Sequence, residues 1–77
     1  MMFDKNKFKE VVDRSGYKGT FIAKELGMSY ALYLQKSNGY SQWKADEIMA
    51  ISETLRLRKQ ERDAIFFAKE VPEMVTN

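Results

Sequence analysis

The sequence predicts an all-α protein built from five short helices in one domain. The only proline is Pro72, so residues 1–71 contain no proline that would break a helix. Apolar residues recur at three- and four-residue spacings in short segments, which is the period of an amphipathic helix. No sustained two-residue alternation of β-branched residues, the pattern of a strand, is present. A chain of 77 residues, of which 44% are hydrophobic, fits one small folded domain.

The first two helices are predicted from their caps and apolar stripes. Asp4 is a good N-cap for the first helix, and Ser15-Gly16 ends it. The second helix runs from Gly19 or Thr20 to Leu26, and Gly27 can then adopt a positive φ without steric cost. The inward-facing residues are Phe8, Val11 and Val12 in the first helix and Ile22, Ala23 and Leu26 in the second.

The third helix is predicted from Tyr30 to about Ser37. Ser29 can cap its N-terminus, and Asn38-Gly39 is a strong C-terminal signal. Tyr33 falls on the inward side of this helix, together with Lys36 and Ser37. A loop over residues 40–43 follows, in which we expect Trp43 to be a core residue between helices.

The fourth and fifth helices are predicted over about Ala45–Leu55 and Lys59–Ala68. Glu47 lies in the first turn of the fourth helix, where a carboxylate interacts favourably with the helix dipole. The apolar residues are Ile48, Ile51 and Leu55 in the fourth helix and Ile65, Phe66 and Phe67 in the fifth. Residues 69–77 hold the proline and few apolar anchors, so we expect a tail that is either loosely ordered or dimer-forming.

Composition excludes most catalytic chemistry. Cysteine and histidine are both absent, which excludes disulfides, zinc fingers, cysteine nucleophiles and histidine acid–base catalysis. The carboxylate pairs Asp46/Glu47 and Glu61/Asp63 are adjacent or two residues apart, and such positions do not face each other on a helix. We therefore expect a protein that is not an enzyme, with no catalytic residue, metal, cofactor or small-molecule substrate.

No membrane or export segment is predicted. Apolar runs such as residues 65–68 fall far short of the roughly 18 residues that span a bilayer. Residues 1–10 mix Phe with charged residues and lack the apolar stretch of a signal peptide. We therefore expect a cytoplasmic protein.

Charge is unevenly distributed along the chain. Residues 1–44 carry eight basic and four acidic residues, whereas residues 45–77 carry five basic and seven acidic residues. No acidic residue occurs between Glu25 and Asp46. A polyanion such as DNA would tolerate this acid-free stretch, and the alternative interpretation is a chance gap.

Residues 22–29, Ile-Ala-Lys-Glu-Leu-Gly-Met-Ser, have the ingredients of a helix-turn-helix. Ala23 is small where two helices would cross, Gly27 bends the chain, Met28 fills the turn and Ser29 caps the next helix. This segment resembles the helix-turn-helix of the XRE family, the lambda-repressor- and Cro-like regulators of bacteria and phages.

The likeness extends over about residues 4–68. Residues 33–39 resemble the end of that family's recognition helix, and the later residues resemble a Firmicutes and phage subgroup: Trp43, Glu47, Ile48, Ile51, Leu55–Leu57 and Ile65–Phe67. The resemblance implies a five-helix, lambda-repressor-like DNA-binding bundle over residues 1–68. It also implies a transcriptional regulator that acts by occupying an operator.

The expected DNA contacts follow from that motif, in which the second helix enters the major groove. Helical spacing then places four residues outward for base contacts: Tyr30, Ala31, Leu34 and Gln35. Gln35 can pair with adenine, and Ala31 and Leu34 can pack on thymine methyl groups. Alternatively, Leu32 and Leu34 are core residues and Gln35 is an ordinary solvated side chain.

Phosphate contacts are expected along the flanks. Where the family commonly has Thr or Ser followed by a phosphate-holding Gln at the start of the second helix, this chain has Lys18 and Gly19. The candidates are therefore Lys18, Thr20, Ser29, Lys36, Asn38, Tyr40 and Lys44. Any one of the lysines could instead belong to a solvated face.

A homodimer on two half-sites would double the base contacts. The apolar C-terminal residues expected at such an interface are Phe66, Phe67, Val71 and Met74. The alternative is that Phe66 or Phe67 closes the core.

Two other functions compete with the DNA-binding hypothesis. A protein-interaction module of the same fold, an antirepressor- or antitoxin-like partner, would use the face from Tyr30 to Leu34 as an apolar patch. A carboxylate-dependent nuclease has little support, because no acidic cluster has metal-ligand spacing.

Overall fold

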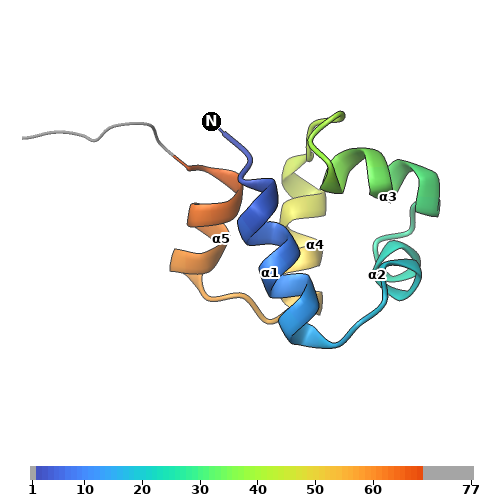
Figure 1. Cartoon of the computed structure of the whole chain (residues 1–77), viewed down its shortest axis with the longest axis horizontal. Helices are drawn as coiled ribbons and strands as arrows, with labels where there is room; N and C mark the ends of the chain where they lie inside the picture. The colour runs from blue at the N-terminus through green and yellow to red at the C-terminus, as the bar shows by residue number, and fades with distance from the viewer. Residues whose placement is uncertain (1, 69–77) are drawn as a thin grey trace, which may run out of the picture.

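Five helices and their connecting loops make up the described part of the chain, residues 2–68 of the computed structural model (Figure 1). The helices are α1 (Lys5–Ser15), α2 (Gly19–Glu25), α3 (Tyr30–Ser37), α4 (Ala45–Thr54) and α5 (Lys59–Phe66). The described residues contain no strand; Met2 and Ala68 form one isolated antiparallel bridge. The predicted all-α, five-helix architecture is confirmed.

The helix boundaries follow the caps read from the sequence. The Asp4 carboxylate accepts a hydrogen bond from the Lys7 N–H at 3.1 Å, and the Ser29 hydroxyl accepts one from the Leu32 N–H at 3.1 Å. Gly16 ends α1 with a φ of 77°, a left-handed conformation that glycine adopts without a Cβ clash. The predicted starts of α1 and α3 are therefore confirmed.

α4 and α5 begin without a side-chain cap from their N-cap residues, Lys44 and Arg58. A glutamate three residues further on takes over part of that role. Glu47 Oε1 accepts from the Lys44 N–H at 2.9 Å, and Glu61 Oε1 accepts from the Arg58 N–H at 3.1 Å. Each helix thus has half of a capping box, which satisfies one N–H donor at its start.

Aromatic rings form one side of the core. Phe8, Trp43 and Phe66 are buried, and their ring centroids lie 5.4–6.2 Å apart. Phe3, which precedes α1, packs on all three rings, a contact that the helical pattern did not predict. Trp43 is a core residue as expected, and its Nε1 donates to the Lys36 carbonyl at 3.1 Å.

The end of α5 corrects the expected dimer surface. Phe66 is only 2% exposed because it closes the core, so its prediction as an interface residue is wrong. Phe67 is 38% exposed, and α5 ends at Phe66 rather than at Ala68. Val71 and Met74 lie outside the described residues.

α2 and α3 lie together at one end of the molecule. α1 packs on α3 and α5, α4 packs on α2 and α5, and α2 packs on α3. Figure 1 shows α5 at the left and the α2–α3 pair at the right, with α1 and α4 between them. No helix within residues 2–68 is both long and apolar enough to cross a membrane.

Candidate nucleic-acid interface

Residues 26–29 form the short turn that joins α2 to α3. Ala23 is 2% exposed at the end of α2, and its carbonyl accepts a hydrogen bond from the Met28 N–H at 3.0 Å. Gly27 has a φ of 70°, which a residue with a Cβ adopts only with strain. Leu26 and Met28 pack against the core and anchor the turn to it, as the sequence predicted.

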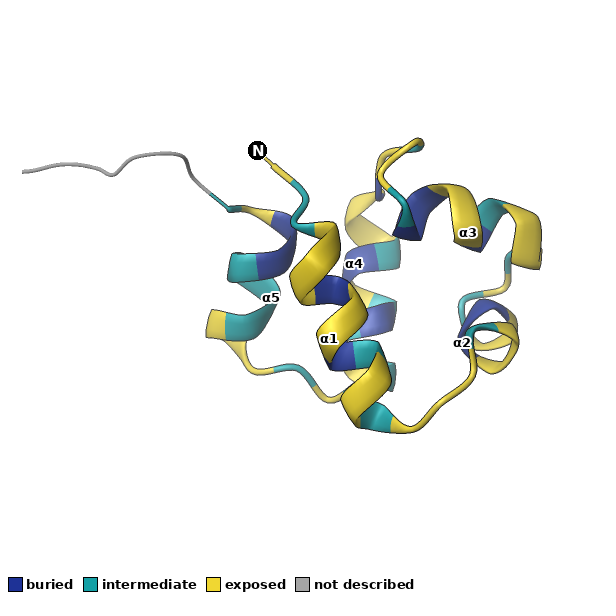
Figure 2. Cartoon of the chain, in the orientation of Figure 1, coloured by how far each residue is buried: buried dark blue, intermediate teal, exposed yellow. Residues whose placement is uncertain are grey.

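α3 turns one face inward and another to solvent (Figure 2). Tyr33, Lys36 and Ser37 are buried, whereas Ala31 and Gln35 are exposed. Tyr30 and Leu34, two further residues of the outward face, are 46% and 39% exposed. We call Tyr30, Ala31, Leu34 and Gln35 the outward face of α3. Its members are the four residues predicted for base contacts, and the helix has the expected rotation.

Gly19, the first residue of α2, lies close to two tyrosine rings of α3. A Cβ at this position would lie 3.0 Å from Tyr33 Cε2 and 3.1 Å from Tyr30 Cε1. The two tyrosine rings stack with centroids 6.2 Å apart. They occupy the space beside the first turn of α2, so only glycine fits there without displacing a ring. Burial, together with the neighbouring Tyr30, raises the pKa of Tyr33 to about 12.

Lys36 does not lie where a phosphate contact requires it, and this prediction is corrected. Its side chain is only 5% exposed, and its Nζ lies 2.8 Å from Glu47 Oε1. The same ammonium donates to the Gln42 carbonyl at 2.7 Å. Lys36 therefore joins α3 to the following loop and to the start of α4. One of the two lysines in the acid-free stretch is thus neutralised by a carboxylate just beyond that stretch.

Glu47 is held in its charged form by the same contacts. Burial acts to raise the pKa of Glu47, but the hydrogen bonds from the Lys36 ammonium and the Lys44 N–H outweigh it. The pKa of this carboxyl consequently lies below its usual value. The Lys36–Glu47 pair thus connects α3 to the first turn of α4.

The other phosphate candidates are distributed around α3. Five of them are exposed: Lys18, Thr20, Ser29, Tyr40 and Lys44. Asn38 is half-buried, and its Nδ2 donates to the Leu34 carbonyl at 2.9 Å, so it is partly committed to ending α3. Lys18 and Lys44 are the N-cap residues of α2 and α4. The basic side chains near α3 thus project from its neighbours rather than from α3 itself.

Ser41 contacts the outward face of α3, which the helical pattern did not predict. Its hydroxyl donates to Gln35 Oε1 at 3.3 Å. The Gln35 carbonyl accepts from the N–H groups of Tyr40 at 2.8 Å and Ser41 at 3.3 Å. The loop after α3 therefore folds back onto Gln35. The six-residue spacing of Ser41 and Gln35 falls outside helical patterns, so only the course of the loop reveals the contact.

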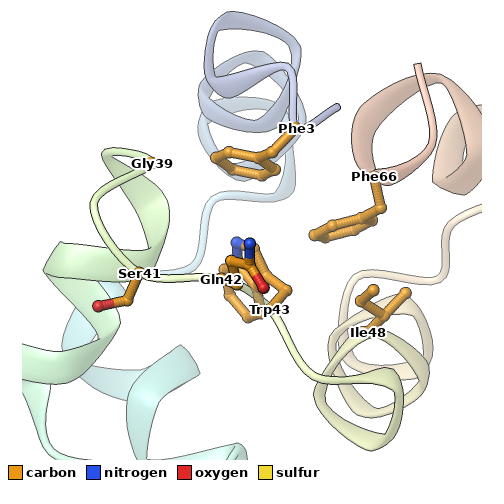
Figure 3. Close-up of a pocket in the computed structure, with 7 residues that line it drawn as sticks. All are labelled: Phe3, Gly39, Ser41, Gln42, Trp43, Ile48 and Phe66. Carbon is orange, nitrogen blue, oxygen red and sulfur yellow. The ribbon is translucent and has the colours of Figure 1, made fainter. Parts of the chain in front are cut away.

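A small apolar pocket lies beside the same loop (Figure 3). The pocket has a volume of about 180 Å³ and is lined by Phe3, Gly39, Ser41, Gln42, Trp43, Ile48 and Phe66. Figure 3 shows Phe3, Phe66 and Ile48 grouped around Trp43, whereas Ser41 points away from them. None of the lining residues carries a titratable side chain, so the pocket offers packing surface rather than acid–base chemistry. Within residues 2–68 no group of three or more acidic side chains is placed to hold a metal ion.

Comparisons with known proteins identify no family for this chain. Neither the scan against protein-family models nor the search of curated proteins finds a match. The functional assignment therefore depends on the turn between α2 and α3, the outward face of α3 and the exposed lysines beside it.

Proposed function

We propose that the chain is a sequence-specific double-stranded-DNA-binding transcriptional regulator of the XRE helix-turn-helix family. In this proposal α3 lies in the major groove and its outward face contacts the edges of base pairs. Occupancy of an operator excludes other proteins from the promoter. No catalytic group or cofactor is needed for such a mechanism.

The proposal is carried by the outward face of α3. Its four members, Tyr30, Ala31, Leu34 and Gln35, are exposed, while Tyr33, Lys36 and Ser37 on the opposite side of the same helix are buried. A helix held in this way presents a fixed set of side chains, and base reading requires such a rigid geometry. Gln35 is the one member of the face that can form two hydrogen bonds with a base edge.

Exposed side chains beside α3 supply the phosphate contacts in this proposal. Lys18 and Thr20 lie at the start of α2, and Lys44 lies at the start of α4. Ser29 caps α3 with its oxygen and keeps its hydroxyl hydrogen for a phosphate. These contacts position α3 in the groove without reading sequence.

A salt titration of DNA binding tests the proposal. Fluorescence anisotropy with a labelled random duplex should show an affinity that falls steeply as salt rises, because bound lysines release counterions. Lys44→Ala should reduce the log–log slope by about 1. Lys59→Ala, at the exposed start of α5, is the matched control and should leave the slope unchanged, because α5 lies at the opposite end of the molecule from α3 (Figure 1). Absence of binding at about 50 mM salt would refute the proposal.

A protein-interaction module of the same fold is the second candidate, and one observation favours it. Tyr17 and Phe21 are both exposed, and their rings pack at a centroid distance of 5.0 Å. With Tyr30 and Leu34 they add apolar surface on the α2–α3 side of the molecule. Under this candidate, Phe21→Ser would abolish partner capture, and the protein would bind no duplex even at low salt.

A further inference from the structure

The outward face of α3 carries no charged side chain. Tyr30, Ala31 and Leu34 offer mainly apolar surface, and Gln35 offers one amide. The only basic residue of α3 is Lys36, whose ammonium is bound to Glu47 and to the Gln42 carbonyl. The helix that would enter the groove therefore has no cation to place against a base.

Each base pair requires a different chemistry from a side chain in the major groove. Guanine is read by Arg or Lys on its O6 and N7 acceptors, and cytosine N4 is read by a carboxylate. Adenine is read by Gln or Asn, and the thymine methyl group is read by apolar contact. The outward face of α3 contains an amide for adenine and apolar side chains for thymine. It contains no cation for guanine and no carboxylate for cytosine.

The side-chain amide of Gln35 accepts a hydrogen bond from the loop that follows α3. The Ser41 hydroxyl donates to Gln35 Oε1 at 3.3 Å, which leaves the second lone pair of Oε1 and both Nε2 hydrogens available. Adenine presents an N6–H donor and an N7 acceptor, which match this oxygen and nitrogen. Holding the amide before binding reduces the rotamer entropy that recognition costs.

We infer that the outward face of α3 selects a half-site of A·T base pairs, with Gln35 on adenine, Ala31 and Leu34 on thymine methyl groups, and Ser41 as the residue that positions Gln35. This inference rests on the proposed function and specifies its substrate class. Lys18 and Lys44 belong to other helices and add affinity for any sequence.

Selection from a pool of random duplexes tests the inference. We expect the enriched core to consist of A·T pairs, with affinity falling about fourfold for each contacted thymine that is replaced by deoxyuridine, which lacks the methyl group. A core with G·C pairs at the positions protected by α3, or affinity indifferent to deoxyuridine, overturns the inference and leaves DNA binding intact. Failure to bind any duplex in the pool overturns the proposed function itself, and the two failures are therefore distinct.

Four variants separate the reading of bases from the stability of the fold. Gln35→Ala should lower discrimination at one A·T pair by roughly 5- to 150-fold. Ser41→Ala should lower discrimination at the same pair by a smaller factor while the melting temperature and the affinity for random duplex stay unchanged, and Ser41→Thr should restore it. Leu34→Arg should introduce a preference for guanine at one position. A Ser41→Ala variant that discriminates like the parent chain would remove Ser41 from the positioning role.

Discussion

The buried ammonium of Lys36 leads to a sharp prediction about stability. Lys36→Met keeps a stem of similar volume and removes the charge. In the parent chain Nζ lies 2.8 Å from Glu47 Oε1 and 2.7 Å from the Gln42 carbonyl. The variant therefore leaves a carboxylate that is only 16% exposed and a carbonyl without their shared donor.

The expected loss follows from these contacts. Removing one member of a buried ion pair costs about 3–5 kcal/mol. The Gln42 carbonyl belongs to an exposed residue, so water can replace the lost donor there. Partial hydration of the Glu47 carboxylate and burial of the apolar methionine side chain offset part of this cost. We therefore expect a decrease of about 2–4 kcal/mol in the free energy of unfolding. In a domain of this size, that corresponds to a fall of roughly 8–30 °C in Tm.

Urea unfolding followed by Trp43 fluorescence and by far-ultraviolet circular dichroism measures this loss. A cycle with Glu47→Gln and the double variant should give a coupling of about 1–3 kcal/mol. Lys9→Met, at an exposed position of α1, is the control and should change stability by no more than about 0.5 kcal/mol. Parent-like stability of Lys36→Met, combined with a reduced salt slope of DNA binding, would refute the buried pair and restore Lys36 as a phosphate contact.

Three further predictions concern the pH dependence of Glu47, the cap of α3 and the end of α5. Because the pKa of Glu47 is lowered in the folded state, its contribution to stability is present above the unfolded pKa and lost as the pH falls through the folded value. Urea midpoints of the parent chain should therefore drop on acidification below about pH 4.3, and those of Glu47→Gln should drop less steeply. Equal pH profiles of the two proteins would contradict the stabilising role of the charged Glu47 carboxylate. Ser29→Ala should cost about 1 kcal/mol of stability through loss of the α3 cap, whereas Ser29→Asp should keep the cap and weaken DNA binding by charge repulsion; calorimetry and anisotropy would separate the two effects. Phe66→Ala should cost about 3–5 kcal/mol in chemical denaturation and Phe67→Ala less than about 1 kcal/mol, and similar losses would show that the core assignment of Phe66 is mistaken.

Local chemistry was sufficient to predict most of the fold. The caps at Asp4 and Ser29 and the glycine at position 27 act within a few residues of themselves, so their effects are visible in the sequence. The rotation of α3 was also predictable, because the helical period places Tyr33, Lys36 and Ser37 on one side.

Contacts between distant segments were not predictable in the same way. Helical spacing turns Lys36 inward, yet its partner Glu47 lies on a different helix, and lysine is seldom buried without a partner. Phe66 and Phe67 are adjacent and lie about 100° apart around a helix, so the rotation set by the packing of α5 decides which of them enters the core. Phe3 and Ser41 lie outside helices, where no period predicts their contacts.

Mapping the DNA-bound surface by nuclear magnetic resonance tests the central claim most directly. Titration of labelled protein with a short duplex selected from the random pool should shift the backbone amides of Thr20, Ser29, Ala31, Gln35 and Lys44. Amides on the outer side of α5 should stay in place. Shifts concentrated on α5, or no shifts at all at low salt, would contradict the assignment of the outward face of α3 as a DNA-reading surface.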